Sequence, residues 1–184
     1  AAELFKIGAR YFIIDIAHGH SVLMKNMIQW LRKEFGSKIY IMAGNVATPE
    51  GVKDLTWFGA DAVKVGIGPG SVCITKNQTG VTFPQFDAVA RCAEAAKFME
   101  NEIGKKIYVV ADGGLREFGD IAKAIGAGAD LVMSGKFFAN TKEAPGKRIY
   151  SEDGDVIAKE YRGMASKEAM KSIKREEDMA TPEG

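Results

Sequence analysis

Residues 105–135, KKIYVVADGGLREFGDIAKAIGAGADLVMSG, decide the fold class of this 184-residue chain. The run 105–114 is a short, continuous apolar strand with a glycine-rich end, and 129–135 repeats that pattern. The segment between them, about 117–127, has helical character, and Gly128-Ala129 falls where that helix must stop. A buried strand, a helix and a second buried strand indicate a βαβ unit with parallel strands.

The same alternation of strand and helix extends upstream through the rest of the first two thirds of the chain. The predicted strands there are 10–17, 38–44 and 61–66, and the predicted helices are 21–35, 48–60 and about 85–102. Five βα units in a row fit either a doubly wound sheet or a (βα)₈ barrel. From about residue 141 the pattern gives way to a polar segment with a predicted hairpin turn at Asp153-Gly154.

Composition and charge exclude several classes of protein. The chain is 46% hydrophobic and 27% charged with a net charge of +1, which is typical of one soluble domain and gives no strong field for nucleic acid or an anionic membrane. No apolar run approaches the ~20 residues of a membrane span, and the charges within the N-terminal segment lead us to expect that it is not a signal peptide. Two cysteines give no disulfide framework and no zinc spacing, so we expect a reduced, intracellular setting.

All five predicted strands end in polar or glycine-rich residues. These ends are Asp15 with His18 and His20, Gly44-Asn45, Gly66–Thr75, Asp112-Gly113-Gly114 and Ser134-Gly135-Lys136. A tight turn would explain any one of them, but together they suit one shared cleft at the carboxyl ends of parallel strands. The last two suit a phosphate held by backbone N–H groups, to which Ser71 could add a hydroxyl. The spacings of a P-loop and of a G-x-G-x-x-G dinucleotide site are absent.

Cys73 lies in GIGPGSVCIT, residues 66–75, directly after a strand. A buried structural thiol is one interpretation. The other is a nucleophile, because a flexible strand exit with many backbone donors can expose and activate a thiol, and Thr75 is close enough for proton transfer. Cys92, in the helical AVARCAEAAKF, is predicted to be a packed helix residue.

His18 and His20 form an H-x-H pair that could supply two metal ligands from one strand end. The chain has no third histidine to complete such a site. Local hydrogen bonding or contact with a substrate is the alternative interpretation.

Several longer motifs resemble one family, that of the inosine-5'-monophosphate dehydrogenases and guanosine-5'-monophosphate reductases. They include IDIAHGHS (14–21), AGNVATPEG (43–51), GADAVKVGIGPGSVCITK (59–76), ADGGLREFGDIAKAIGAGADLVMSGKFFA (111–139) and YRGMASKEAM (161–170). The resemblance implies a (βα)₈ barrel of which this chain covers about strands 4–8. Residues 1–140 would form the C-terminal part of the barrel, and 141–184 an active-site flap with a hairpin. We therefore expect the sequence to be a piece of a longer protein whose first three barrel strands are missing here.

The resemblance also implies residue roles. Cys73 would attack purine C2 and form a covalent intermediate, with Thr75 and Glu183 as its catalytic partners. The nucleotide would be bound at its phosphate, ribose or base by Ser71, Asp112, Gly114, Gly135, Tyr161, Gly163 and Met164. Asp15, Asn45 and Gly66 would line the dinucleotide side, and the carbonyls of Gly68, Gly70 and Cys73 match the family's potassium loop. Lys136 departs from the Ser or Gly found in many members beside the phosphate.

The two reactions of the family differ after the cysteine adduct has formed. The dehydrogenase hydrolyses the adduct with an Arg-Tyr pair on the flap, but here the matching interval, KSIKREEDMAT (171–181), is short and has no tyrosine. Reductive deamination instead needs a general acid for the leaving amine, which suits Thr75 and Glu183, although many dehydrogenases also have this couple. IDIAHGHS and YRGMAS lean towards reductase members as well.

We therefore expect an enzyme that uses NADPH to reduce GMP to IMP and ammonia. The alternative is an IMP dehydrogenase that converts IMP, NAD and water to XMP and NADH. The resemblance further suggests K⁺, a cytoplasmic location and a homotetramer. Two other readings stay open: a nucleotide-binding module without turnover, and a barrel phosphate-binder in which the cysteine is incidental.

Overall fold

The computed structural model describes residues 1–73 and 75–163, and its centre is a parallel five-stranded sheet. The strands are β1 (Tyr11–Asp15), β2 (Tyr40–Val46), β3 (Ala62–Val65), β4 (Tyr108–Asp112) and β5 (Leu131–Met133). They lie side by side in chain order, β1-β2-β3-β4-β5, and every neighbouring pair is parallel. A doubly wound sheet reverses its strand order at a switch point. The uninterrupted order therefore decides for the barrel-type α/β arrangement.

Four helices follow the strands where the sequence predicts them. They are α2 (Val22–Phe35), α3 (Pro49–Phe58), α5 (Gln85–Ile103) and α6 (Phe118–Gly126). The start of α3 shows why they begin where they do: the Thr48 side chain accepts a hydrogen bond from the Gly51 N–H, and Pro49 occupies the first turn. Ser21 caps α2 in the same way, through the Met24 N–H.

Three shorter helices and a 3₁₀ turn complete the described elements of the body. These are α1 (Ala2–Lys6), α4 (Thr75–Thr79), α7 (Gly135–Ala139) and η1 (Gly36–Lys38). The sequence predicts no helix or strand between the strand 61–66 and the helix at about 85–102, where α4 forms. The residues of α4, TKNQT, are polar and contain no buried position, so no apolar periodicity marks the helix in advance.

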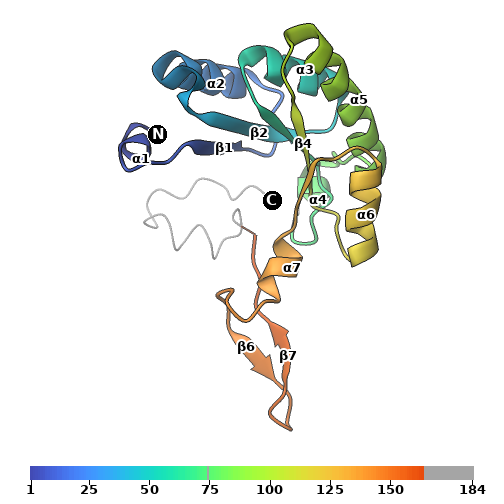
Figure 1. The fold of residues 1–184 in the computed structure, drawn as a ribbon. Helices are drawn as coiled ribbons and strands as arrows, with labels where there is room; N and C mark the ends of the chain where they lie inside the picture. The colour runs from blue at the N-terminus through green and yellow to red at the C-terminus, as the bar shows by residue number, and fades with distance from the viewer. Residues whose placement is uncertain (74, 164–184) are drawn as a thin grey trace.

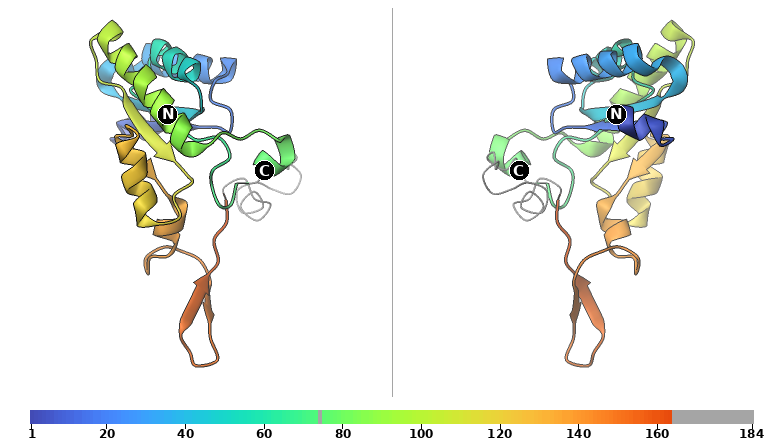
Figure 2. Two further views of the ribbon diagram at one scale, coloured as in Figure 1. Left: turned by 90° about the vertical axis from the view of Figure 1, so that its right-hand side faces the viewer. Right: turned by 90° about the vertical axis from the view of Figure 1, so that its left-hand side faces the viewer.

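The long helices all cover the same face of the sheet (Figures 1 and 2). Side chains from that face and from the helices form the core, among them Ile28, Ile41, Leu55, Val63 and Met99, each 1% exposed or less. Because successive side chains of a strand point to opposite faces, every second side chain lies on the face that the helices do not cover. On β1 the side chains on that face are those of Tyr11, Ile13 and Asp15, which are exposed. In the sheet β1 and β5 are the two edge strands.

The carboxylate of Asp61, which is 4% exposed, links segments at the amino ends of the strands. It accepts a hydrogen bond from the Ile41 N–H at 2.6 Å and forms ion pairs with Arg32 and Lys105. Arg32 also donates to the Gly59 carbonyl at 2.7 Å and to the Ile39 carbonyl at 2.9 Å. One carboxylate thus ties α2, β2 and the loop before β4 together, at the end of the sheet remote from the polar strand exits.

The predicted turn at Asp153-Gly154 is confirmed. It joins β6 (Arg148–Tyr150) and β7 (Val156–Lys159) in an antiparallel hairpin, with Gly154 at a φ of +87°. The hairpin projects away from the sheet and its helices (Figures 1 and 2). The division of the chain near residue 141 stays a prediction. Within the described residues no helix is both long and apolar enough to cross a membrane.

Candidate active site

The exits of β1, β2, β3 and β4 meet through a buried lysine. Lys64 has a 1% exposed side chain, and its Nζ lies 2.8 Å from Asp15 Oδ1 and 2.8 Å from Asp112 Oδ2. Asn45 Nδ2 donates to the same oxygen of Asp112 at 3.0 Å and to the Gly66 carbonyl at 2.8 Å. The structure thus brings together all three predicted dinucleotide-side residues and the predicted ribose-binding carboxylate.

Sequence reasoning missed Lys64. Its signal was available, because it is the only charged residue inside the apolar run AVKV of β3. A lysine in a strand that is buried on both faces needs a partner for its charge. Only the folded sheet shows that the partners come from two other strands.

Gly66, which follows β3, is a point of close approach between two strand exits. It has a φ of +152°, and a Cβ added there would lie 2.2 Å from the carbonyl oxygen of Asp112. Gln85, at the start of α5, donates from Nε2 to the Val65 carbonyl at 2.9 Å and to the Asp112 carbonyl at 3.3 Å. Gln85 is a second residue of the site that the sequence did not single out, and it joins the exits of β3 and β4.

The cysteine loop packs against the exit of β4. A Cβ on Gly113 would lie 3.1 Å from the Gly70 amide nitrogen, and one on Gly114 would lie 3.2 Å from the Pro69 side chain. The Cys73 N–H donates to the Gly70 carbonyl at 3.2 Å, and its thiol is free and partly buried. These contacts hold Cys73 in a turn beside the predicted nucleotide-binding exit.

Cys92 is confirmed as a packed helix residue. It is 0% exposed in α5, and burial raises the pKa of its thiol to about 12. A thiol with that pKa is protonated at neutral pH and is a poor nucleophile.

Three further predicted residues of the nucleotide side, Gly135, Tyr161 and Gly163, have close neighbours. The hydroxyl of Tyr161 lies so near Gly135 that an added Cβ there would be 1.8 Å from it. An added Cβ on Gly163 would lie 3.4 Å from the Val72 side chain, one residue before Cys73. Ser71 is exposed, and Thr75 is the first residue of α4. Met164 and Glu183 lie outside the described residues.

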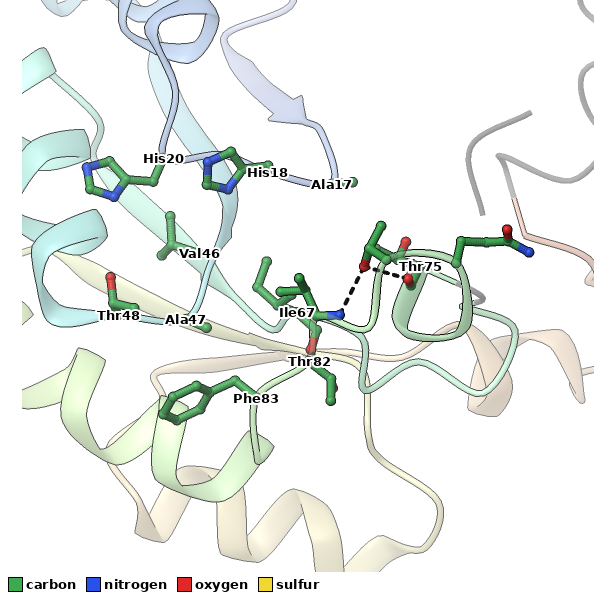
Figure 3. A pocket seen from close by; sticks show the side chains of 13 residues that line it. Ala17, His18, His20, Val46, Ala47, Thr48, Ile67, Thr75, Thr82 and Phe83 are labelled. Atoms are coloured by element: carbon green, nitrogen blue, oxygen red, sulfur yellow. Dashed lines mark hydrogen bonds between the residues drawn. The ribbon is translucent and has the colours of Figure 1, made fainter. Parts of the chain in front are cut away.

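A cavity of about 700 Å³ opens between the exits of β1 and β2 and the α4 segment (Figure 3). Its walls include His18, His20, Ile67, Thr75 and Phe83. Figure 3 shows the two histidines on the β1 side and Thr75 across from them. The lining residues Ala17, Val46 and Ile67 each follow a predicted dinucleotide-side residue by one or two positions. The cavity therefore adjoins the buried lysine network.

His20 has a local partner, as one of the two interpretations of the H-x-H pair expects. Its Nε2 lies 2.8 Å from Asp54 Oδ2 of α3. No group of three His, Cys, Asp or Glu side chains within residues 1–73 and 75–163 is placed to hold a metal ion. A potassium ion on the carbonyls of Gly68, Gly70 and Cys73 stays a prediction.

Together these features define an α/β-barrel type of protein with a polar site at the carboxyl ends of its strands. The family described as "IMP dehydrogenase / GMP reductase domain" matches residues 1–184. Inosine-5'-monophosphate dehydrogenase from Chlorobaculum tepidum is 47% identical over 167 residues, which are 91% of this chain and 32% of that protein. GMP reductase from Mesoplasma florum is 48% identical over 158 residues, 85% of this chain and 46% of that protein.

A solved structure is similar as well. It is a cysteine-to-alanine variant of GMP reductase from Trypanosoma brucei in complex with guanosine 5'-monophosphate, with 43% sequence identity and a TM-score of 0.84. The match covers 94% of this chain and 34% of that one. The chain belongs to the IMP dehydrogenase / GMP reductase family, whose named members are oxidoreductases. It spans about a third to a half of the length of these relatives.

Proposed function

We propose that the protein is a GMP reductase-type enzyme, which uses NADPH to convert GMP to IMP and ammonia. The observation that carries the purine-nucleotide part is the packing of the cysteine loop on the exit of β4. Through Pro69 and Gly70, that contact brings the loop that carries the free, partly buried Cys73 against Gly113 and Gly114, which directly follow Asp112. A nucleophile next to backbone donors and a ribose-binding carboxylate is the arrangement that chemistry at the base of a bound nucleotide needs.

The nucleotide would be held along its length by residues from several exits. Asp112 accepts from the ribose hydroxyls, and Gly163 and Met164 contact the base. The phosphate is bound by Ser71, Gly114, Gly135 and Tyr161. The position of the Tyr161 hydroxyl against Gly135 supports this assignment, because a phosphate bound by the Gly135 backbone would meet that hydroxyl.

In the reaction, the Cys73 sulfur bonds to C2 of the guanine while the bond from C2 to the amino nitrogen breaks. Thr75 and Glu183 deliver the proton with which the nitrogen leaves as ammonia. A reduced dinucleotide held by Asp15, Asn45 and Gly66 would supply the hydride that C2 receives. Cys73 then leaves as a thiolate, which restores the enzyme and gives IMP and the oxidised dinucleotide.

The described residues fit a dinucleotide beside the nucleotide. The cavity of about 700 Å³ is within the size range of small-molecule sites, and Thr75 forms part of its wall. Asp15, Asn45 and Gly66 would hold the dinucleotide, next to the lining residues that follow each of them. For the potassium ion, the Gly70 carbonyl already accepts one hydrogen bond, from Cys73, and has a second lone pair to offer. A homotetramer is part of the proposal.

The direction of the reaction depends on the interval 171–181, which contains no Arg-Tyr pair with which to activate water. The relatives include proteins of both names at similar identity, so IMP dehydrogenase is the second candidate. The test is an assay of the complete natural protein that follows the absorbance of the reduced dinucleotide. One reaction contains GMP and NADPH, and a separate one contains IMP and NAD. Consumption of NADPH with GMP alone supports the proposal, whereas formation of NADH with IMP alone overturns it.

The two cysteines provide a matched control. Cys73→Ser should abolish turnover, while Cys92→Ala, which removes a buried thiol in α5, should retain it. Binding of GMP without any turnover in the unsubstituted protein would instead indicate a nucleotide-binding module.

A further inference from the structure

We propose that Lys64 is a positioning residue that couples the nucleotide and dinucleotide subsites, an inference that rests on the proposed function. Its single ammonium group contacts both Asp112, assigned to the nucleotide ribose, and Asp15, assigned to the dinucleotide side, at 2.8 Å each. A change that displaces this nitrogen therefore disturbs both subsites together.

The register of the sheet explains how one side chain reaches both carboxylates. Asp15 of β1, Gly44 of β2 and Lys64 of β3 are aligned across neighbouring strands and point to the same face. To contact Asp15, the lysine must cross β2. It can do so because Gly44 has no side chain: a Cβ there would lie 2.5 Å from the Lys64 Cβ.

Asp112 is reached in the other direction. Lys64 pairs in register with Val110 of β4, and Asp112 is two residues further along the same strand, on the same face. Asn45 supports Asp112 from β2 through its 3.0 Å hydrogen bond. Three strands thus contribute to the placement of this one carboxylate.

The three charged side chains differ in burial, which indicates which of them can bind a ligand and which can only position the others. The Lys64 side chain is 1% exposed, whereas those of Asp112 and Asp15 are 21% and 59% exposed. The carboxylates can therefore meet ligands while the lysine stays behind them. Without the ammonium, two carboxylates would face each other with no cation between them, and their repulsion would turn Asp112 away from the ribose.

The experiment measures binding and turnover separately in the complete natural protein. Dissociation constants for GMP and IMP are determined by calorimetry without dinucleotide, and KM and kcat are determined for the active pair of substrates. Lys64→Met should weaken nucleotide binding about tenfold and raise the dinucleotide KM to a similar degree, with a smaller change in kcat. Lys64→Arg, which keeps the charge, should restore part of the nucleotide affinity and part of the dinucleotide KM. Lys97→Met, an exposed lysine of α5, makes the same change in net charge and should alter neither.

A role in folding alone would give a different result, because loss of folded enzyme lowers the apparent kcat and leaves KM unchanged. That result, or a Lys64→Met change confined to one substrate, overturns the inference. If Lys64→Met does not fold, Asp15→Asn decides, since it alters an exposed carboxylate and keeps the lysine. The coupling requires that it weaken GMP binding about threefold or more, although Asp15 is on the dinucleotide side. Unchanged GMP binding overturns the coupling.

The outcome also separates this inference from the proposed function. If the unsubstituted protein binds neither GMP nor IMP, the proposed function fails and the coupling falls with it. If it binds them and Lys64→Met does not alter that binding, the coupling alone fails.

Discussion

Gly44 and Lys64 lie so close across β2 and β3 that a Cβ on the glycine would be 2.5 Å from the Cβ of the lysine and 2.7 Å from its carbonyl oxygen. The glycine is therefore required by its neighbour and not by its own backbone, since its φ is outside the left-handed region. The path of the lysine to Asp15 depends on it.

Gly44→Ala should displace the Lys64 side chain or separate the two strands. We expect lower thermal stability and, in the complete natural protein, nucleotide binding that is weaker by about tenfold. Calorimetric titration with GMP and a thermal unfolding curve check both. Gly126→Ala in α6 is the control, because an added Cβ there meets nothing within 4 Å and alanine favours a helix. Equal behaviour of the two variants would contradict the close approach.

Asp61→Asn should destabilise the fold without a direct effect on the site. It removes the charge that pairs with Arg32 and Lys105 in a place where the carboxylate is 4% exposed. Loss of one partner of a buried pair costs about 3 kcal/mol, which chemical denaturation would measure as a lower midpoint. KM values measured well below the unfolding temperature should be unchanged. A comparable loss of stability in Lys123→Met, an exposed lysine of α6, would show that the effect is not specific.

Tyr40 should give a distinct titration at high pH. Burial, together with the nearby charge of Asp61, raises the pKa of its phenol to about 12. The folded state therefore keeps this proton at pH values where an unfolded chain, with a pKa of about 10, releases it. Since the folded state then binds more protons, stability should fall as pH rises from about 10 towards 12.

Difference absorbance of the phenolate in the folded protein, compared with Tyr40→Phe, measures this titration. The substituted protein should lose the late phase and should lose less stability at alkaline pH. If the Tyr40 phenolate formed over the same pH range as those of the exposed tyrosines, the raised pKa of Tyr40 would be contradicted.

The two thiols should differ sharply in their reaction with iodoacetamide. Cys92 is 0% exposed and has a pKa raised to about 12, so the folded protein should be alkylated at Cys73 alone. Peptide mass spectrometry would identify the modified residue, and both cysteines should react once the chain is unfolded. GMP should protect Cys73 if the nucleotide binds as proposed. Alkylation of Cys92 under native conditions would show that α5 opens readily.

The elements of the sheet and the long helices could be predicted from the sequence, because each depends on local patterns such as the apolar run before Asp112 or the Thr48-Pro49 cap. The order of the strands could not, since a doubly wound sheet and a barrel use the same βα units. The polar exits were predicted as one cleft, and Asp15, Asn45, Gly66 and Asp112 do meet.

Lys64 and Gln85 escaped prediction for a physical reason. Their partners are 20 to 49 residues away in the chain, and no local periodicity encodes such contacts. The short helix α4 escaped for the opposite reason, because its five polar residues bury nothing. The roles assigned to individual site residues remain predictions.

The strand β3 and the residue before it carry two buried charges with different tasks. Asp61 secures the amino end of the sheet, and Lys64, three residues or about 10 Å further on, organises the carboxyl end. The two networks share no side chain among the contacts described above. The free energy of unfolding and the proposed ligand binding can therefore be tested at separate positions of one short segment, the first by substitutions at Asp61 and the second by substitutions at Lys64.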